Sequence, residues 1–342
     1  MLQLVNRARA NPAAEAARFG IDLNEGLDPG TITTDPKPPL ACNADLIQSA
    51  REHSLWMLAQ DQFSHYETND GTYADPGDRM TAAGYVFSGS WTWGENIVWR
   101  GTTGPAPAVA PTLALEHQDL FVDSEEPGRG HRLNLMDPAF REVGIGAESG
   151  VFATGGQNYN CVMTTQDFAS SGGNPGPFLV GVVYRDSNKD GFYTVGEGKS
   201  GVTIMPDRGT YYAISSTSGG YAIPITGLSG TLQVTFSGGP LTAPFTKSVT
   251  LTGTNNVELD FEMIKDTATP LQFVQGSAKF SPQGQFDVDL RGPAGAQVTI
   301  HASSDLTNSV VAGSITLIGG TGHFTDRPPA GTPRRFYWAT SP

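Results

Sequence analysis

The sequence predicts an α+β protein, in which a mixed α and β domain at the N-terminus is followed by one or two all-β sandwich modules. Helical patterns occur only before about residue 168, while short apolar runs separated by Gly, Ser and Pro fill the rest. A length of 342 residues is typical of two or three domains. We expect domains at residues 1–168, 178–264 and 271–342, the last being a small β module or an extension of the second.

The spacing of apolar residues indicates the helices of the first domain. The opening run "MLQLVNRARANP" has an amphipathic pattern. Asn43 is a suitable N-cap for a helix that reaches about residue 60, because apolar residues recur at helical spacing after it. A second helical pattern covers residues 112–122. The runs "EVGIGA" and "CVMTTQDF" favour strands, so we expect helices and strands in one domain.

The composition of the chain changes at residues 169–177. This run, "ASSGGNPGP", offers little apolar area to bury and is typical of a linker. Beyond it, the runs "FLVGVVYRD", "GVTIM", "YAIPI" and "TLQVTF" predict short strands. A second break at residues 265–270 precedes "QFDVDL" and "AQVTIHAS". The second half of the chain is therefore predicted to be all β.

The charge and the hydropathy pattern exclude several classes of partner. The net charge is -13 and no run of Lys or Arg is present, so we expect no nucleic-acid partner and no electrostatic docking on anionic membranes. No apolar run reaches the roughly 18–20 residues that span a bilayer. We expect a monomer without a transmembrane segment. The first residues lack the pattern of a signal peptide, so a secreted protein would have its signal outside this sequence.

The two cysteines, Cys42 and Cys161, allow two interpretations. They are compatible with one disulfide bond in an oxidising compartment. Two buried free thiols would give the same sequence.

Polar residues at positions expected to be apolar indicate a site in the first domain. Glu116 and His117 lie on the buried stripe of the helix at 112–122, and Glu95 follows Gly94 between aromatic residues. Burying an unpaired charge costs several kcal/mol, so such groups need a polar partner, a metal or a water-filled cavity. Each of them is also compatible with a hydrogen-bonded core residue.

The histidines of the first domain differ in their expected positions. His53 falls on the apolar stripe of its helix and should face inward, while His65 should project from a loop at the end of that helix. His131 follows the turn "PGRG", which can present its side chain at a cavity. His301 and His323 lie in strand and turn contexts and are expected at the surface.

Ordered fragments of residues 1–168 resemble a known family. They are "LQLVNRARANPAAEAARF", "LIQSAREHSLWMLAQDQFSHYETNDG", "DRMTAAGY", "GENIVW", "GHRLNLMDPAFREVGIG" and "MTTQDF". They occur in the order found in the CAP superfamily of SCP-like extracellular domains, and look most similar to its bacterial branch. The resemblance implies an α-β-α sandwich, secretion and a large central cavity.

In that family two histidines and two acids line the cavity, and the histidines can hold zinc. The matching motifs place His65 in the "FSH" segment, Glu95 in "GEN" and His131 in "GHR". The fourth member is open, because the family's usual Trp-containing helix is replaced here. We expect Glu116 on its periodicity, with His117 and Asp119 as alternatives.

The run "DSNKDGFYTVGE" predicts a calcium site in the second domain. It fits D-x-N-x-D-G-x5-E without a mismatch and supplies hard oxygen ligands for a hard cation. The alternative is an acidic turn without an ion. The flanks are strands, so the loop resembles those of calcium-stabilised β modules similar to the SdrD B-like or carboxypeptidase-regulatory-like families. The expected ligands are Asp186, Asn188, Asp190, the Phe192 carbonyl, Thr194 through water, and Glu197.

Three functions follow from these features. We expect a secreted or cell-surface binding protein whose cavity holds zinc and a lipid, peptide or glycan. The alternative is a metal-dependent extracellular hydrolase, a peptidase or esterase, although neither H-E-x-x-H nor G-x-S-x-G occurs. A third possibility is an adhesive surface protein. In the hydrolase, the catalytic residues would be His65, Glu95, Glu116 and His131.

Overall fold

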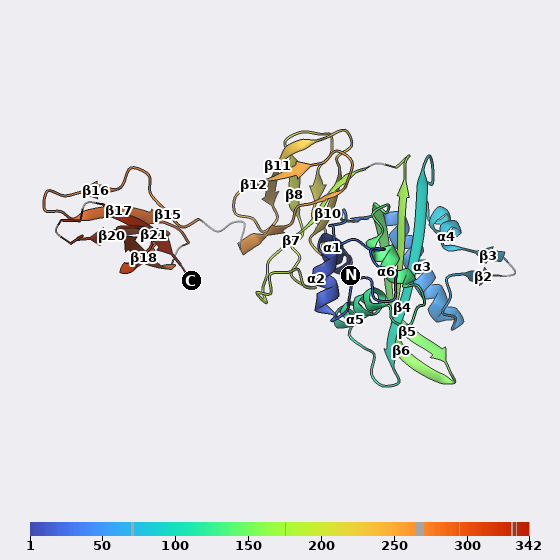
Figure 1. The fold of residues 1–342 in the computed structure, drawn as a ribbon. Helices are drawn as coiled ribbons and strands as arrows, with labels where there is room; N and C mark the ends of the chain where they lie inside the picture. The colour runs from blue at the N-terminus through green and yellow to red at the C-terminus, as the bar shows by residue number, and fades with distance from the viewer. Residues whose placement is uncertain are drawn as a thin grey trace. The chain divides into compact units, whose positions relative to one another are not determined.

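The structure is a computed structural model. It describes residues 1–69, 72–174, 176–264, 270–293, 295–329, 331–332 and 334–341. The chain divides into two compact units, Met1–Phe261 and Glu262–Pro342 (Figure 1). The first unit contains the first expected domain and nearly all of the second, and the finer division at the linker stays a prediction.

A four-stranded sheet forms the centre of the first domain, in the order β1-β5-β6-β4. Strand β1 pairs with β5 in parallel, and the other neighbours are antiparallel. The long strands match the predicted runs "EVGIGA" and "CVMTTQDF". The bounds are Ala41–Cys42 for β1, Trp91–Thr102 for β4, Glu142–Thr154 for β5 and Gln157–Ser171 for β6.

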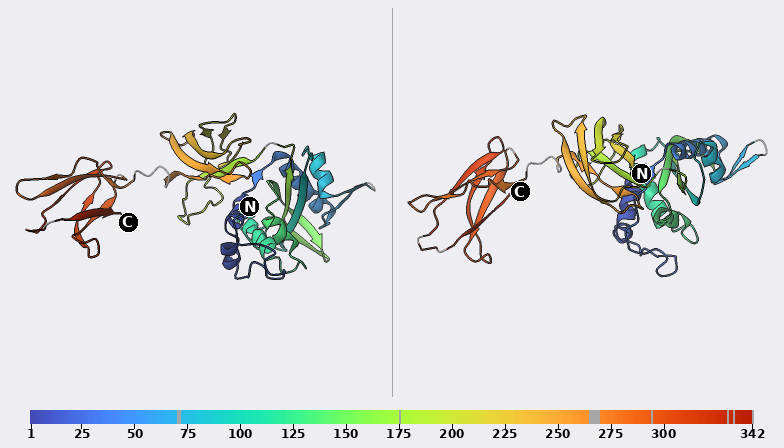
Figure 2. Two further views of the ribbon diagram at one scale, coloured as in Figure 1. Left: turned by 45° about the horizontal axis from the view of Figure 1, so that its top comes forward. Right: turned by 90° about the horizontal axis from the view of Figure 1, so that it is seen from above.

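Helices cover both faces of this sheet (Figures 1 and 2). Helices α3 and α4 lie on one face, and α1, α2, α5 and α6 lie on the other. This is an α-β-α sandwich followed by β-rich sheets, so the predicted α+β class is confirmed. The bounds are Leu2–Ala10 (α1), Pro12–Arg18 (α2), Ala44–Gln60 (α3), Pro76–Ala82 (α4), Val109–Val122 (α5) and Gly130–Met136 (α6).

Helix α3 packs directly on β5, because two glycines leave room for its backbone. A Cβ atom at Gly144 would lie 1.9 Å from the carbonyl carbon of Leu46, and one at Gly146 would lie 2.2 Å from the amide nitrogen of Arg51. The N-cap prediction for this helix agrees with the structure, since the Asn43 side chain accepts hydrogen bonds from two amides of the first turn. The helix predicted at residues 112–122 begins three residues earlier.

The opposite face of the sheet holds the largest apolar core of this domain. Here α1, α5 and α6 pack against β5 and β6. Fully buried members of this core include Val5, Phe121, Leu135, Val143 and Phe168.

The rest of the first unit consists of two further sheets, in the orders β10-β7-β13 and β12-β11-β8-β9. They bury Val182, Ile204 and Phe236 among others. The bounds are Phe178–Tyr184 (β7), Val202–Pro206 (β8), Ala213–Ile214 (β9), Gly220–Pro224 (β10), Gly230–Gly238 (β11), Phe245–Leu251 (β12), Val257–Glu258 (β13) and Phe261–Glu262 (β14, which pairs with β7).

These sheets make specific contacts with the first domain. The Asn256 amide donates to the carbonyl oxygens of Pro39 and Arg141 at 2.9 and 2.7 Å. Phe178 and Val180 of β7 form an apolar cluster with Ala41. The β module is therefore packed on the N-terminal domain within one unit.

The second unit is built from two sheets around its own apolar core, which contains Val288, Leu290, Val298, Ile300 and Phe324. One sheet has the order β15-β17-β16 with β20 on β17, and the other has the order β19-β18-β21. The bounds are Gln272–Phe273 (β15), Lys279–Phe280 (β16), Phe286–Arg291 (β17), Gln297–Ser303 (β18), Val310–Thr316 (β19), Thr321–Asp326 (β20) and Phe336–Thr340 (β21).

Both cysteines are free thiols, so the disulfide interpretation is wrong for this structure. Cys42 pairs with Val143 of β5, while Cys161 pairs with Gly150 at the other end of the same strand. Those two positions are about 20 Å apart along a strand, far beyond the reach of a disulfide bond.

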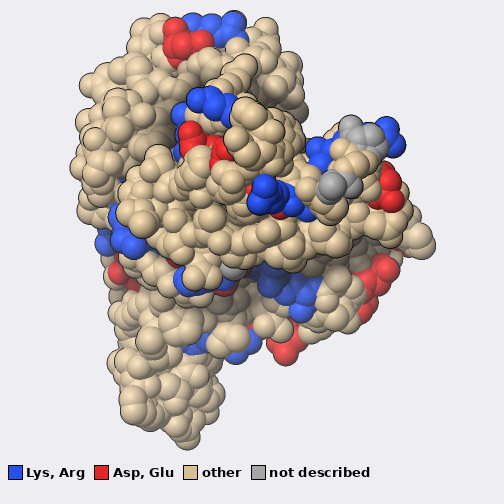
Figure 3. All heavy atoms as spheres, turned by 90° about the vertical axis from the view of Figure 1, so that its left-hand side faces the viewer, with Lys and Arg blue, Asp and Glu red and all other residues tan. Residues whose placement is uncertain are grey.

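The length of the helices and the distribution of surface charge are relevant to the expected membrane and nucleic-acid partners. None of the helices in the described part of the chain is long and apolar enough to cross a membrane. On the face seen in Figure 3, uncharged residues form most of the surface, and acidic and basic groups are intermixed.

Candidate functional site

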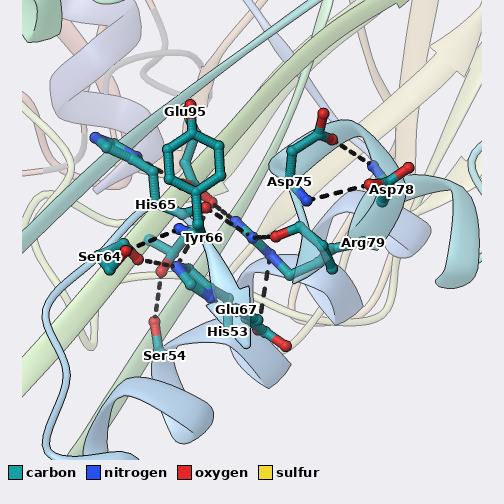
Figure 4. Close-up of polar contacts among 12 residues, drawn as sticks. His53, Ser54, Ser64, His65, Tyr66, Glu67, Asp75, Asp78, Arg79 and Glu95 are labelled. Atoms are coloured by element: carbon teal, nitrogen blue, oxygen red, sulfur yellow. Dashed lines mark hydrogen bonds and ion pairs between the residues drawn. The ribbon is translucent and has the colours of Figure 1, made fainter. Parts of the chain in front are cut away.

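His65 and Glu95 form the first half of the site. His65 lies in the loop after α3, and its Nδ1 atom is 2.7 Å from Glu95 Oε1 on β4. The Glu95 side chain is 1% exposed, whereas that of His65 is 41% exposed. The imidazole is thus reachable from solvent, and the carboxylate that orients it is not (Figure 4).

Arg79 of α4 holds this pair in place. One terminal nitrogen of its guanidinium donates to Glu95 Oε2, and the other donates to the His65 backbone carbonyl at 2.8 Å. Burial alone would raise the pKa of Glu95, but the hydrogen bond from His65 and the charge of Arg79 bring it below its ordinary value. Glu95 is therefore an ionised carboxylate inside the domain. No sequence signal had singled out Arg79.

His53 supports the same cluster from α3. It is fully buried, as predicted, with Nδ1 at 2.8 Å from Glu67 Oε1 and Nε2 at 2.9 Å from the Ser64 carbonyl. Its Nε2 atom also lies 3.9 Å from Glu95 Oε2. Because Ser64 precedes His65, these bonds fix the loop that carries the exposed imidazole (Figure 4).

Asp167 is a second carboxyl group next to Glu95. The two residues are direct partners across the β4–β6 ladder, and Asp167 is fully buried. Burial, and then the neighbouring charge of Glu95, raise the pKa of Asp167 well above its ordinary value. Of the two carboxyl groups, Glu95 is therefore the one that ionises more readily.

His131 and Asp123 form the second half of the site. Asp123 ends α5 in a left-handed conformation, with φ 52°. Its Oδ1 atom is 2.7 Å from His131 Nδ1, and its Oδ2 atom accepts from the backbone amides of His131 and Arg132. One carboxylate therefore caps the first turn of α6 and orients the imidazole. The turn predicted at Gly128 is present, since Gly128 and Arg129 both have positive φ.

Helix α6 is tied to the strand that carries Glu95. The Asn134 amide donates to the Glu95 carbonyl at 3.1 Å and to Asn96 Oδ1 at 2.9 Å. In return, Asn96 donates to the His131 carbonyl at 3.2 Å. These bonds hold His131 beside the segment of β4 to which His65 is paired.

A cavity of about 640 Å³ opens beside His131. Neither His65 nor Glu95 is among its lining residues, although Phe63 and Ile97, each two positions away, are. The lining residues are Phe63, Ile97, Val98, Trp99, Arg100, Gln118, Asp119, Leu120, Val122, Asp123, Ser124, Glu125, Glu126 and His131.

Glu116, the expected fourth member of the cluster, has no hydrogen bond to His65 or His131 among the contacts of the described residues. Glu116 is fully buried, and its Oε2 atom accepts from the Thr164 hydroxyl at 2.7 Å. Burial raises its pKa to about 8. Its position on the inner stripe of α5 directs it at β6 instead of at the imidazoles.

The two alternatives have other partners, although Asp119 also lines the cavity beside His131. His117 Nε2 lies 2.9 Å from Glu15 Oε1 in the core, and burial lowers the pKa of His117. Asp119 binds Arg100 through both oxygens, at 2.5 and 2.6 Å. The acid that contacts the second imidazole is Asp123, one position past the end of α5. One feature of the sequence could have identified Asp123 in advance: it is an Asp at the end of the expected helix, eight residues before His131.

No group of three or more His, Cys, Asp or Glu side chains close enough to hold a metal ion occurs among the described residues. The two imidazoles each have one carboxylate partner, so the site consists of two histidine–carboxylate pairs. His301 and His323, expected at the surface, lie in the second unit on β18 and β20.

The loop predicted to bind calcium folds around its own acids. Asp186 accepts from the backbone amides of Asp190 and Gly191 at 3.2 and 2.9 Å. Glu197, which is 6% exposed, accepts from the amides of Ser187 and Thr194. Gly191 has the positive φ that the motif requires at this position.

The class of protein to which the N-terminal domain belongs follows from its fold and from a comparison with known families. Residues 2–168 match the family model described as CAP, Cysteine-rich secretory protein family. The N-terminal domain is a CAP domain, as the ordered fragments predicted.

Three bacterial proteins are among those to which this chain is similar. The uncharacterized protein YkwD of Bacillus subtilis (strain 168) is 33% identical over 113 residues, which are 33% of this chain and 36% of that protein. An extracellular protein containing a SCP domain from Bacillus anthracis str. Ames is 26% identical, with a TM-score of 0.26, over 39% of this chain and 34% of that one. A putative carbohydrate binding protein from Bacteroides uniformis ATCC 8492 has 12% identity and a TM-score of 0.19. The chain spans about a third of the length of the first two proteins.

Proposed function

We propose that this is a secreted or cell-surface binding protein whose CAP domain holds zinc through His65 and His131, with a lipid, peptide or glycan in the adjacent cavity. The observation that carries the proposal is the pairing of each imidazole. In both residues Nδ1 faces a carboxylate, Glu95 or Asp123, that is at most 3% exposed. Such pairing places a proton on Nδ1 and, in a neutral imidazole, leaves the lone pair on Nε2, which is the arrangement of zinc-binding histidines.

The donor set would offer zinc two protein ligands. Two imidazole nitrogens are suitable ligands, and the remaining positions of a tetrahedral ion are left for solvent or for a bound ligand. Zinc held there by His65 and His131 would supply Lewis acidity toward an oxygen of that ligand. Glu95 and Asp123 orient the imidazoles and are themselves held by Arg79 and by the amides of α6.

Zinc titration of purified protein tests the proposal. We expect stoichiometric zinc by calorimetry, lost in His65→Ala and in His131→Ala and retained in the control His301→Ala. Loss in only one of the two histidine variants would contradict a shared ion. Hydrolysis of a model ester or peptide that disappears in Glu95→Gln would replace the binding function by the hydrolase alternative.

We also propose that the loop at residues 186–197 binds calcium and stabilises the β module. Its support is the complete motif together with the buried twelfth carboxylate, Glu197. The ligands would be Asp186, Asn188, Asp190, the Phe192 carbonyl, Thr194 through water, and Glu197.

Calcium should therefore raise the thermal stability of the protein. For a site with a Kd on the order of 0.1–1 mM, 10 mM calcium adds about 1.4–2.7 kcal/mol to the free energy of unfolding. Glu197→Gln should abolish this gain in thermal unfolding, whereas Asp207→Asn, an exposed acid of the same module, should keep it. An equal gain in both variants would show that calcium acts elsewhere.

A further inference from the structure

The loop at residues 186–197 contacts the CAP domain as well as its own module. It lies in the connection from β7 to β8, and Figure 1 shows this connection extending toward α1 and α2. The guanidinium group of Arg7 on α1 lies over the ring of Phe192, with 5.0 Å between the Arg7 Cζ atom and the ring centroid. This distance is within the range of a cation–π interaction. The loop proposed as a calcium site is thus joined to the first helix of the chain.

Arg7 presents a fixed surface to this ring. Its Nε and Nη2 atoms donate to the two carboxylate oxygens of Glu15, at 2.8 and 2.5 Å. Glu15 is 2% exposed, and its Oε1 atom also lies 2.9 Å from His117 Nε2. A bidentate pair restrains the orientation of the planar guanidinium group as well as its position. The ring of Phe192 therefore packs against a group that the CAP core already orients.

Phe192 also belongs to the expected ion site. It occupies the seventh position of the motif, which supplies a backbone carbonyl to calcium. Its amide donates to Asp190 Oδ1 at 2.8 Å, so an acid of the motif holds this backbone. The next residue, Tyr193, packs edge-on against Tyr184 of β7, with 6.0 Å between ring centroids. The loop is thus anchored to its own module through Tyr193 and to the CAP domain through Phe192.

Calcium and Arg7 would each restrict the conformation of the same residue. An ion bound to the Phe192 carbonyl restricts the backbone that carries the ring, and the contact with Arg7 restricts the ring itself. Each interaction therefore reduces the conformational entropy that is lost when the other one forms. By thermodynamic linkage, the contact raises the affinity for calcium by the same factor by which calcium strengthens the contact.

We propose that calcium in this loop strengthens the attachment of the β module to the CAP domain, through the contact of Phe192 with Arg7. The inference rests on the proposed calcium site and adds to it a residue of the other domain. Its consequence is that Arg7, which is not a calcium ligand, determines part of the affinity for calcium. A purely electrostatic effect of Arg7 would have the opposite sign, because removing a positive charge favours the binding of a cation.

Calorimetric titration of calcium into the full chain tests the inference. We expect Phe192→Leu, which keeps the backbone carbonyl, to weaken calcium binding about two- to fivefold, the effect of one partly exposed cation–π contact. Arg7→Gln should weaken it by the same factor. The double variant should bind calcium no more weakly than either single variant, because both changes remove one contact. The control is Arg18→Gln, since Arg18 is an exposed arginine that pairs with the same Glu15, and its affinity should equal that of the wild type.

The variants should stay folded, because the hydrogen bonds from Asn256 to the carbonyls of Pro39 and Arg141 do not involve the loop. Circular dichroism would verify this, and Phe192→Leu decides alone if Arg7→Gln unfolds. Wild-type affinity in Phe192→Leu, or tighter binding in Arg7→Gln, would overturn the inference and leave the calcium site intact. Additive losses in the double variant would also overturn it, because the two residues would then act separately. If the wild type binds no calcium, the site fails and this inference fails with it.

Discussion

Replacing Arg79 by methionine is expected to lower the free energy of unfolding by about 3–5 kcal/mol. The variant leaves the buried carboxylate of Glu95 without its guanidinium partner and removes the donor to the His65 carbonyl. Loss of one partner of a buried pair is costly, because the remaining charge is desolvated and unpaired. Urea unfolding followed by circular dichroism would measure the change.

A matched control is Arg51→Met on α3. Arg51 pairs with Glu148 at 2.8 Å, but its side chain is 59% exposed, so this change should lower the stability far less than Arg79→Met. Arg79→Lys should give an intermediate loss, since an ammonium group cannot reach both Glu95 and the His65 carbonyl in the same planar geometry. If Arg79→Met and Arg51→Met lower the free energy of unfolding equally, the buried ion pair of Arg79 and Glu95 does not contribute more to stability than an exposed pair.

The fold of the first domain followed from local signals. The apolar stripe and the Asn43 cap defined α3, and the glycine-containing run "EVGIGA" proved to be the start of the strand on which that helix packs. Helix α6 was not predicted, because "GHRLNLM" is too short to show a clear period. The free cysteines could not be predicted either, since strand order decides whether Cys42 and Cys161 can meet.

The site was predicted only in part, and the reason is physical. His65, Glu95 and His131 were chosen by motif, but the partners that orient them are set by tertiary contacts across long stretches of sequence. Helical periodicity correctly predicted that Glu116 is buried. It could not show that the facing group is Thr164 of β6, because the pattern of one helix contains no information about the opposite strand. Arg79 was missed for the same reason.

The Glu116→Gln variant is expected to be more stable than the wild type at pH 8, but equally stable at pH 4.5. Burial raises the pKa of Glu116 to about 8 in the folded protein, against 4.5 for an exposed glutamate. Below pH 4.5 the group is protonated in both the folded and the unfolded chain, so its contribution is constant. As the pH rises from 4.5 to 8, the unfolded chain releases this proton first, and stability falls. Each unit of pKa difference corresponds to about 1.4 kcal/mol, so the total loss is on the order of a few kcal/mol.

Glutamine cannot ionise, yet it keeps an oxygen that accepts from the Thr164 hydroxyl. The variant should therefore match the wild type in urea unfolding at pH 4.5 and exceed it progressively at pH 6.5 and 8. Glu148→Gln is the control, because this glutamate is partly exposed and pairs with Arg51 at the surface. Its pH profile should run parallel to that of the wild type. If the stability of Glu116→Gln also changes with pH in parallel with the wild type, the Glu116 carboxyl group is already ionised in the folded protein near neutral pH. Burial on α5 would then not raise its pKa.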